Sequence, residues 1–132
     1  MLKHSNDTKR IRAIIKCFSF LDGFDVVYER HKKGYSCIFN KNSISIIIKD
    51  SGDYRDENRI DFVIKNGTTV LFSFFYKAML NSNLEYVDKM ETAVNSVYQS
   101  ASGKGFTNND YLKIIQIYAE FVKANLCHIL SS

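Results

Sequence analysis

Five short stretches rich in alternating or continuous apolar residues fill the middle of this 132-residue chain. They are Phe24–Arg30, Tyr35–Asn40, Ser43–Lys49, Arg59–Lys65 and Thr68–Tyr76. Alternation of apolar and polar residues places one face of a strand in the core and the other in water. The short connections between them join antiparallel neighbours, because a parallel crossover needs a dozen or more residues. The sequence therefore predicts an antiparallel sheet of about five strands.

Three local patterns refine the predicted sheet. The run Ile46-Ile47-Ile48 indicates a central strand that is buried on both faces. In Arg59–Lys65 the apolar residues alternate, so we expect Ile60, Phe62 and Ile64 to point inward. Asn66-Gly67 predicts a type I′ turn, which needs a positive φ at both central residues.

A first amphipathic helix is predicted before the sheet. Ser5, Asn6, Asp7 and Thr8 are all competent N-caps, and we expect Asp22-Gly23 to end the helix. The helical spacing places one apolar stripe on it, formed by Ile11, Ile14, Ile15 and Phe18. We expect the basic residues to form a solvated face: Lys9, Arg10, Arg12 and Lys16.

Two further helices are predicted after the sheet. Residues 83–101 carry apolar residues at helical spacing, with Asn83 as the expected cap. The final helix has caps at Asn108 to Asp110 and a broad apolar face in YLKIIQIYAEFVKANLCHIL. We therefore expect an α+β fold, with the two C-terminal helices packed on the sheet and a single domain over residues 1–132.

Composition and charge restrict the function. No stretch approaches the roughly twenty apolar residues of a transmembrane helix, and we expect a cytoplasmic protein without a membrane partner. Cys17, Cys37 and Cys127 are far apart and lie in apolar contexts, so we expect three buried free thiols. Residues 1–49 carry ten Lys/Arg and four Asp/Glu, which makes the first third basic. A basic patch can attract nucleic acid or an acidic partner.

The motifs that would support metal or catalytic chemistry are incomplete. The loop Asp50–Asp61 resembles a calcium loop in its acids, but Arg55 stands where an EF-hand needs glycine. His4, His31 and His128 show no zinc-ligand spacing with each other or with cysteine. We expect no cofactor, no metal and no enzymatic activity.

The polar loop after the third predicted strand is the first candidate binding site. Its acids, Asp50, Asp53, Asp56 and Glu57, outnumber the single basic residue Arg55. Tyr54 adds a side chain that is favoured at protein interfaces. The loop is either an acidic recognition patch or a solvated hairpin loop.

A second candidate is the hairpin that joins the first two predicted strands. Nucleic-acid-binding proteins use basic side chains to contact the phosphate backbone and aromatic side chains to stack on bases, and this hairpin contains both kinds. They are Tyr28, Arg30, Lys32, Lys33 and Tyr35. Lysines in turns also protect edge strands from aggregation, so nucleic acid is the weaker alternative.

The size, the order of elements and the apolar last helix with Tyr111, Tyr118, Phe121 and Leu126 resemble small bacterial immunity proteins. These proteins are encoded beside contact-dependent growth inhibition and other polymorphic toxins. The resemblance implies a cytoplasmic protein without enzymatic activity. Its partner would be the C-terminal domain of a cognate toxin, and binding would block the active or substrate-binding surface of that toxin.

The hypothesis from sequence is therefore an immunity protein that binds its toxin through the acidic loop and the adjacent strand faces, with Glu85 and Tyr86 as secondary candidates. The predicted partner-binding residues are Asp50, Asp53, Tyr54, Asp56, Glu57, Glu85 and Tyr86. The alternatives are a small nucleic-acid-binding module and a secretion chaperone or adaptor.

Overall fold

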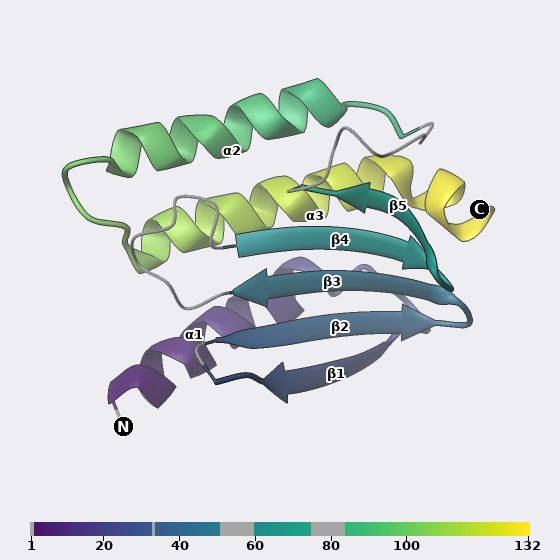
Figure 1. The fold of residues 1–132 in the computed structure, drawn as a ribbon, viewed down its shortest axis with the longest axis horizontal. Helices are drawn as coiled ribbons and strands as arrows, with labels where there is room; N and C mark the ends of the chain where they lie inside the picture. The colour runs from purple at the N-terminus through teal and green to yellow at the C-terminus, as the bar shows by residue number, and fades with distance from the viewer. Residues whose placement is uncertain (1, 33, 51–59, 75–83) are drawn as a thin grey trace. The chain divides into compact units, whose positions relative to one another are not determined.

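The computed structural model describes residues 2–32, 34–50, 60–74 and 84–132, and it has an α+β fold (Figure 1). The helices are α1 (Leu2–Cys17), α2 (Val87–Ala101) and α3 (Asn108–Leu130). The strands are β1 (Asp25–Arg30), β2 (Tyr35–Lys41), β3 (Ile44–Asp50), β4 (Ile60–Asn66) and β5 (Thr69–Ser73). The predicted order, a helix followed by antiparallel strands and two helices, is confirmed.

The chain divides into two compact units that interleave along the sequence. One unit contains Met1–Asp22 and Glu85–Leu126, and therefore holds α1, α2 and most of α3. The other contains Gly23–Leu84 and Cys127–Ser132, and therefore holds the sheet. The single domain and the packing of the helices on the sheet stay predictions.

The five strands form one antiparallel sheet in the order of the sequence (Figure 1). β3 is the central strand, as its run of isoleucines predicted. On β4, Ile60, Phe62 and Ile64 are fully buried, which confirms the inward face. Ile47 is only partly buried, so the opposite face of β3 is less covered than the sequence indicated.

The turn between β4 and β5 differs from the type I′ turn predicted at Asn66-Gly67. Asn66 pairs with Thr69, so Gly67 and Thr68 form the loop, and only Gly67 has a positive φ, of 59°. The side chain of Asn66 explains the difference. Its Oδ1 accepts a hydrogen bond from Ser43 at 2.6 Å, and its Nδ2 donates to the Ser132 carbonyl at 2.6 Å. These bonds engage Asn66 as the last residue of the strand.

α1 begins and ends earlier than predicted. It runs from Leu2, through the expected caps Ser5 to Thr8, and ends at Cys17 before Asp22-Gly23. The intrinsic cost of such polar residues inside a helix is below about 1 kcal/mol each, so the helix can continue through them. Of the predicted apolar stripe, Ile14 and Phe18 are buried, but Ile15 is 43% exposed.

The basic side of α1 is not uniformly solvated, because Arg10 is 8% exposed. Its Nε donates a hydrogen bond to Asn108 Oδ1 at 3.0 Å. Its guanidinium carbon lies 4.6 Å from the ring centroid of Tyr111, which is a cation–π geometry. Arg10 therefore joins α1 to the first turn of α3, which a count of surface charges does not indicate.

A capping box starts α3. The backbone N–H and the hydroxyl of Thr107 both donate to Asp110 Oδ2 at 2.9 Å, and the Asp110 N–H donates to Thr107 Oγ1 at 3.2 Å. Such reciprocal bonds satisfy amide donors that a helix N-terminus leaves open. The cap is thus Thr107, one residue before the predicted Asn108 to Asp110.

The three cysteines occupy different environments. Cys37 is buried, Cys17 is partly buried and Cys127 is exposed. The prediction of three buried thiols is therefore wrong at Cys127. That residue lies near the C-terminal end of α3, where helical periodicity turns it to solvent between the partly buried Leu126 and the buried Ile129.

Candidate functional site

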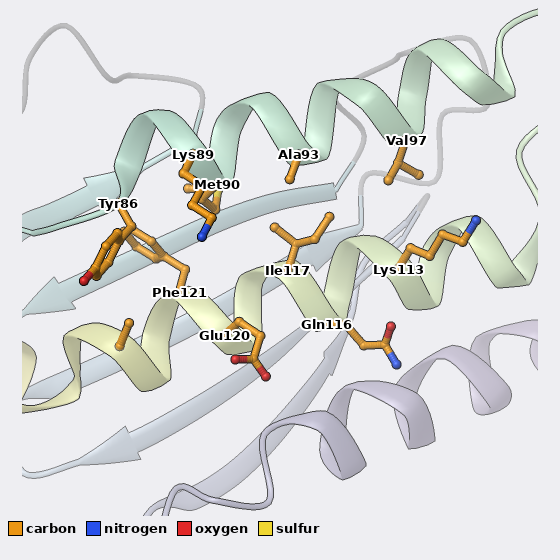
Figure 2. A pocket seen from close by; sticks show the side chains of 11 residues that line it. Tyr86, Lys89, Met90, Ala93, Val97, Lys113, Gln116, Ile117, Glu120 and Phe121 are labelled. Carbon is orange, nitrogen blue, oxygen red and sulfur yellow. The ribbon is translucent and has the colours of Figure 1, made fainter.

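An open groove runs between α2 and α3 within the helical unit (Figure 2). It has a volume of about 730 Å³. Its apolar lining consists of Met90, Ala93, Val97, Ile117, Phe121 and Ala124. Its polar lining consists of Tyr86, Lys89, Lys113, Gln116 and Glu120. An apolar floor with a few polar groups around it is typical of binding sites.

Helical periodicity places these residues in the groove. On α2 the lining residues follow steps of three or four from Lys89 or Met90 through Ala93 to Val97. On α3 the same steps run from Lys113 to Ala124. Residues with this spacing share one face of a helix. Another side of α3 is buried, with Ile114, Tyr118 and Val122 among its core residues. The groove side is separate from that core face and mixes the apolar Ile117 and Phe121 with polar residues.

Tyr86, at one end of the groove, has an unusual conformation. It is the N-cap of α2 and has φ 67° and ψ 20°, in the left-handed region. Its side chain makes no capping hydrogen bond, although N-cap positions favour Ser, Thr, Asp and Asn. The ring is 56% exposed. Neither capping nor core packing therefore explains a tyrosine at this position.

The backbone before Tyr86 is held by a residue of α3. Asn125 is fully buried, and its Oδ1 accepts a hydrogen bond from the Glu85 N–H at 2.7 Å. Its Nδ2 donates to the Glu85 carbonyl at 2.9 Å. These bonds hold the backbone that leads into α2 against α3, and the Tyr86 ring lies beside the groove (Figure 2).

Positive charge lies toward both ends of the groove. Lys89 is at the end near Tyr86, and Lys113 is at the end near Val97 (Figure 2). Glu120 extends from α3 on the side away from α2. The three charged lining residues give a formal sum of +1. The groove thus combines an apolar floor with a slightly basic rim.

The structure describes three of the seven predicted partner-binding residues. Asp50 ends β3 and is 2% exposed, so its side chain offers almost no surface to a partner. Glu85 and Tyr86 precede α2 and are both exposed. Asp53, Tyr54, Asp56 and Glu57 lie outside the described residues, as does the predicted cap Asn83.

Sequence reasoning missed most of the groove residues. The broad apolar face predicted for the last helix includes Ile117 and Phe121, but the sequence does not divide that face between the core and a second surface. An apolar face wider than one packing interface needs was the available signal that part of this helix forms a second surface. Lys89 and Lys113 carried no signal, because charges on a helix are usually solvated.

In the β1–β2 hairpin, which was predicted as an alternative nucleic-acid site, only one of the two tyrosines is exposed enough to stack on a base. Tyr28 is 41% exposed, and the Arg30 guanidinium lies 6.0 Å from its ring centroid. Tyr35 is 1% exposed, although its centroid lies 5.9 Å from that of Tyr28. A buried ring cannot stack on a base, so this hairpin is a weaker stacking platform than its sequence indicated.

Metal ligands do not gather in the described part of the chain. No group of three or more His, Cys, Asp or Glu residues there could hold a metal ion. His31 instead shares a 2.7 Å hydrogen bond between its Nε2 and Ser36 Oγ. The helices among the described residues also lack the combination of length and apolarity that crossing a membrane requires.

No family model, no curated protein and no solved structure matches this chain.

Proposed function

We propose that this protein is an immunity protein that binds and neutralises the C-terminal domain of a cognate bacterial toxin. The α2–α3 groove and Tyr86 are the main contact in this proposal. Binding there would cover the active or substrate-binding surface of the toxin. The protein itself would make or break no covalent bond.

The observation that carries the proposal is the conformation of Tyr86 beside an apolar groove. Non-glycine residues in the left-handed region carry a local energetic cost, and such residues cluster at functional sites. Exposed tyrosines that flank apolar surface are frequent anchors of protein interfaces. Tyr86 combines both properties and was also among the residues expected to contact the toxin.

The test is binding to the C-terminal domain of a toxin encoded beside the gene for this protein, once such a neighbour is identified from the genome. We expect the purified toxin domain to co-purify with the protein and to lose its toxicity on co-expression. Tyr86→Ala should weaken binding by roughly 30-fold, the equivalent of about 2 kcal/mol for an interface anchor. The matched control is Tyr28→Ala, which removes another exposed tyrosine from β1 and should leave the affinity unchanged.

Two results would count against the proposal. A toxin domain that neither binds nor loses toxicity rejects the immunity function. Equal affinity of the Tyr86→Ala variant and the wild type rejects Tyr86 as an anchor. A combined Asp53→Ala, Tyr54→Ala and Glu57→Ala variant tests the acidic loop separately, because unchanged binding would remove that loop from the interface.

A further inference from the structure

We propose that the α2–α3 groove receives an amphipathic α-helix of the partner that carries a carboxylate toward each end of its apolar stripe. The inference rests on the proposed function, since it describes the segment of the partner that occupies the groove. The dimensions, backbone chemistry and charges of the groove each support it.

The length of the groove fits about three helical turns. Its lining extends from Tyr86 to Val97 on α2 and from Lys113 to Ala124 on α3. Each span is twelve residues, or eleven steps of 1.5 Å, so each wall is about 17 Å long. A helix of about twelve residues would therefore contact both walls along their whole length.

The backbone of the walls favours a helical occupant over an extended one. Both walls are α-helices, whose N–H and C=O groups are bonded within each helix. An extended peptide in the groove would find no backbone partners there and would bury its own polar groups unsatisfied. A helix satisfies its backbone internally and presents only side chains.

Ala93 has the smallest side chain among the residues that line the α2 wall of the groove. It lies between Met90 and Val97, and Ile117 of α3 faces it across the floor (Figure 2). A large apolar side chain at the centre of the bound helix would fill this space. Leucine or phenylalanine at that central position is therefore expected.

The two lysines set the charge pattern of the occupant. Lys113 lies at the end of the groove near Val97, which is eight residues from Lys89 along α2. Eight residues correspond to about 12 Å along a helix. Carboxylates seven or eight positions apart on the bound helix would lie near both lysines. A helix with lysines at these positions would be repelled.

The experiment selects ligands from a phage-displayed library of 14-residue helical peptides with one randomised face. The immobilised target is the full-length protein. We expect enriched peptides to share apolar residues at i, i+3 or i+4 and i+7, with acids seven or eight positions apart. A selection that enriches no such pattern overturns the inference.

Two variants then locate the peptide. Ala93→Arg fills the centre of the groove and should abolish binding, measured by fluorescence anisotropy. Its matched control, Asn95→Arg, places the same side chain on the exposed face of α2 and should leave binding unchanged. Equal affinity of wild type and Ala93→Arg for the selected peptide overturns the inference.

Reversal of the charge at Lys113 gives a second test that does not depend on the folding of Ala93→Arg. Lys113→Glu should weaken binding at least tenfold, and a peptide with lysine in place of the facing acid should recover most of that loss. Lack of recovery, in a Lys113→Glu protein with the helical content of the wild type, contradicts the charge pattern.

Binding assays with the cognate toxin domain distinguish this inference from the proposed function. Equal toxin binding by wild type and Ala93→Arg would retain the immunity function and reject the groove as its site. A toxin domain that does not bind would reject the function, while the peptide selection still decides what the groove accepts.

Discussion

The side-chain amide of Asn125 bonds both polar groups of the Glu85 backbone, although the two residues are 40 positions apart. The third bond of this amide runs from Nδ2 to the Phe121 carbonyl at 2.9 Å, one turn earlier on α3. Asn125 is fully buried, so all three bonds form away from solvent. Asn125 thus links α3 to the residue that precedes Tyr86 and the start of α2.

Replacement of Asn125 should destabilise the protein strongly. Asn125→Ala removes the partners of the Glu85 N–H and C=O, and a buried polar group left unsatisfied costs about 1–3 kcal/mol. We expect the free energy of unfolding to fall by about 2–3 kcal/mol, measured by urea denaturation. Asn125→Asp should be at least as severe, because it removes both Nδ2 donors and places a carboxylate in a buried site.

Asn95→Ala is the matched control for this prediction. Asn95 lies on the exposed side of α2, and its replacement should change the free energy of unfolding by less than about 0.5 kcal/mol. Equal stability of Asn125→Ala and Asn95→Ala would show that solvent replaces the three bonds without loss.

The capping box of α3 should make stability depend on pH in the acid range. The hydrogen bond from the Thr107 backbone N–H is the main cause that lowers the pKa of Asp110 in the folded protein. A lowered folded pKa adds stability above the ordinary aspartate value of about 4, and this stability is lost as the pH falls through the folded pKa.

Asp110→Asn tests that dependence. The variant should be less stable than wild type near pH 7, and the difference should shrink as the pH is lowered from 5 to 2. Thr107→Ala should cost about 1 kcal/mol at neutral pH, as expected for loss of an N-cap. A difference between wild type and Asp110→Asn that stays constant with pH would contradict the role assigned to the carboxylate.

The sheet was predictable because its signals are local. Alternation in β4 gave the buried set Ile60, Phe62 and Ile64, and the isoleucine run identified β3 as central. Predictions were wrong where a residue bonds to partners far away in the sequence. Asn66 was expected to form the turn, but its bonds to Ser43 and Ser132 engage it as the last residue of β4.

The candidate site was less predictable, because it forms where two helices meet. Spacing within α2 or within α3 cannot show that their apolar faces leave an open groove between them. The left-handed conformation of Tyr86 also cannot be predicted from the sequence, since tyrosine has no preference for that conformation. Asn125 was a further local signal, because an amide among the apolar residues of a helix often makes a specific buried hydrogen bond.

The three cysteines should react with thiol reagents in a fixed order. Cys127 is exposed, and Cys17 is partly buried, with its pKa raised by desolvation. Burial raises the pKa of Cys37 to about 11. Because the thiolate is the nucleophile, iodoacetamide at pH 8 should modify Cys127 first, Cys17 more slowly and Cys37 only on unfolding.

Peptide mapping by mass spectrometry at timed intervals measures this order. Cys127→Ser should remove the fast phase and leave the other two rates unchanged. Modification of Cys37 at the rate of Cys127 would show that the sheet opens readily around β2.

Arg10 should contribute to stability more than its position among surface basic residues suggests. Arg10→Ala removes the bond to Asn108 and the cation–π contact with Tyr111, and we expect a loss of about 2 kcal/mol. Arg10→Lys should lose part of this, because lysine lacks the planar guanidinium. Arg12→Ala, an exposed neighbour on α1, is the control and should change stability by less than about 0.5 kcal/mol. Similar losses for Arg10→Ala and Arg12→Ala would contradict the buried role.

Tyr86 should show opposite effects on stability and on binding. Its φ of 67° is unfavourable for any residue with a Cβ, at roughly 1–2 kcal/mol, and glycine avoids that cost. Tyr86→Gly should therefore be more stable than Tyr86→Ala by about 1 kcal/mol in urea denaturation. Both variants lack the exposed ring, so both should lose the same roughly 30-fold in affinity for the toxin domain.

The comparison of these two variants separates strain from contact. If Tyr86→Ala is as stable as Tyr86→Gly, the left-handed conformation carries no energetic cost, and the conformation of Tyr86 is then no sign of a functional role. If both variants bind the toxin domain as tightly as wild type, the ring makes no contact with it. A stability gain for glycine over alanine, with equal loss of binding in both, means that the chain retains an unfavourable residue because its side chain contacts the partner.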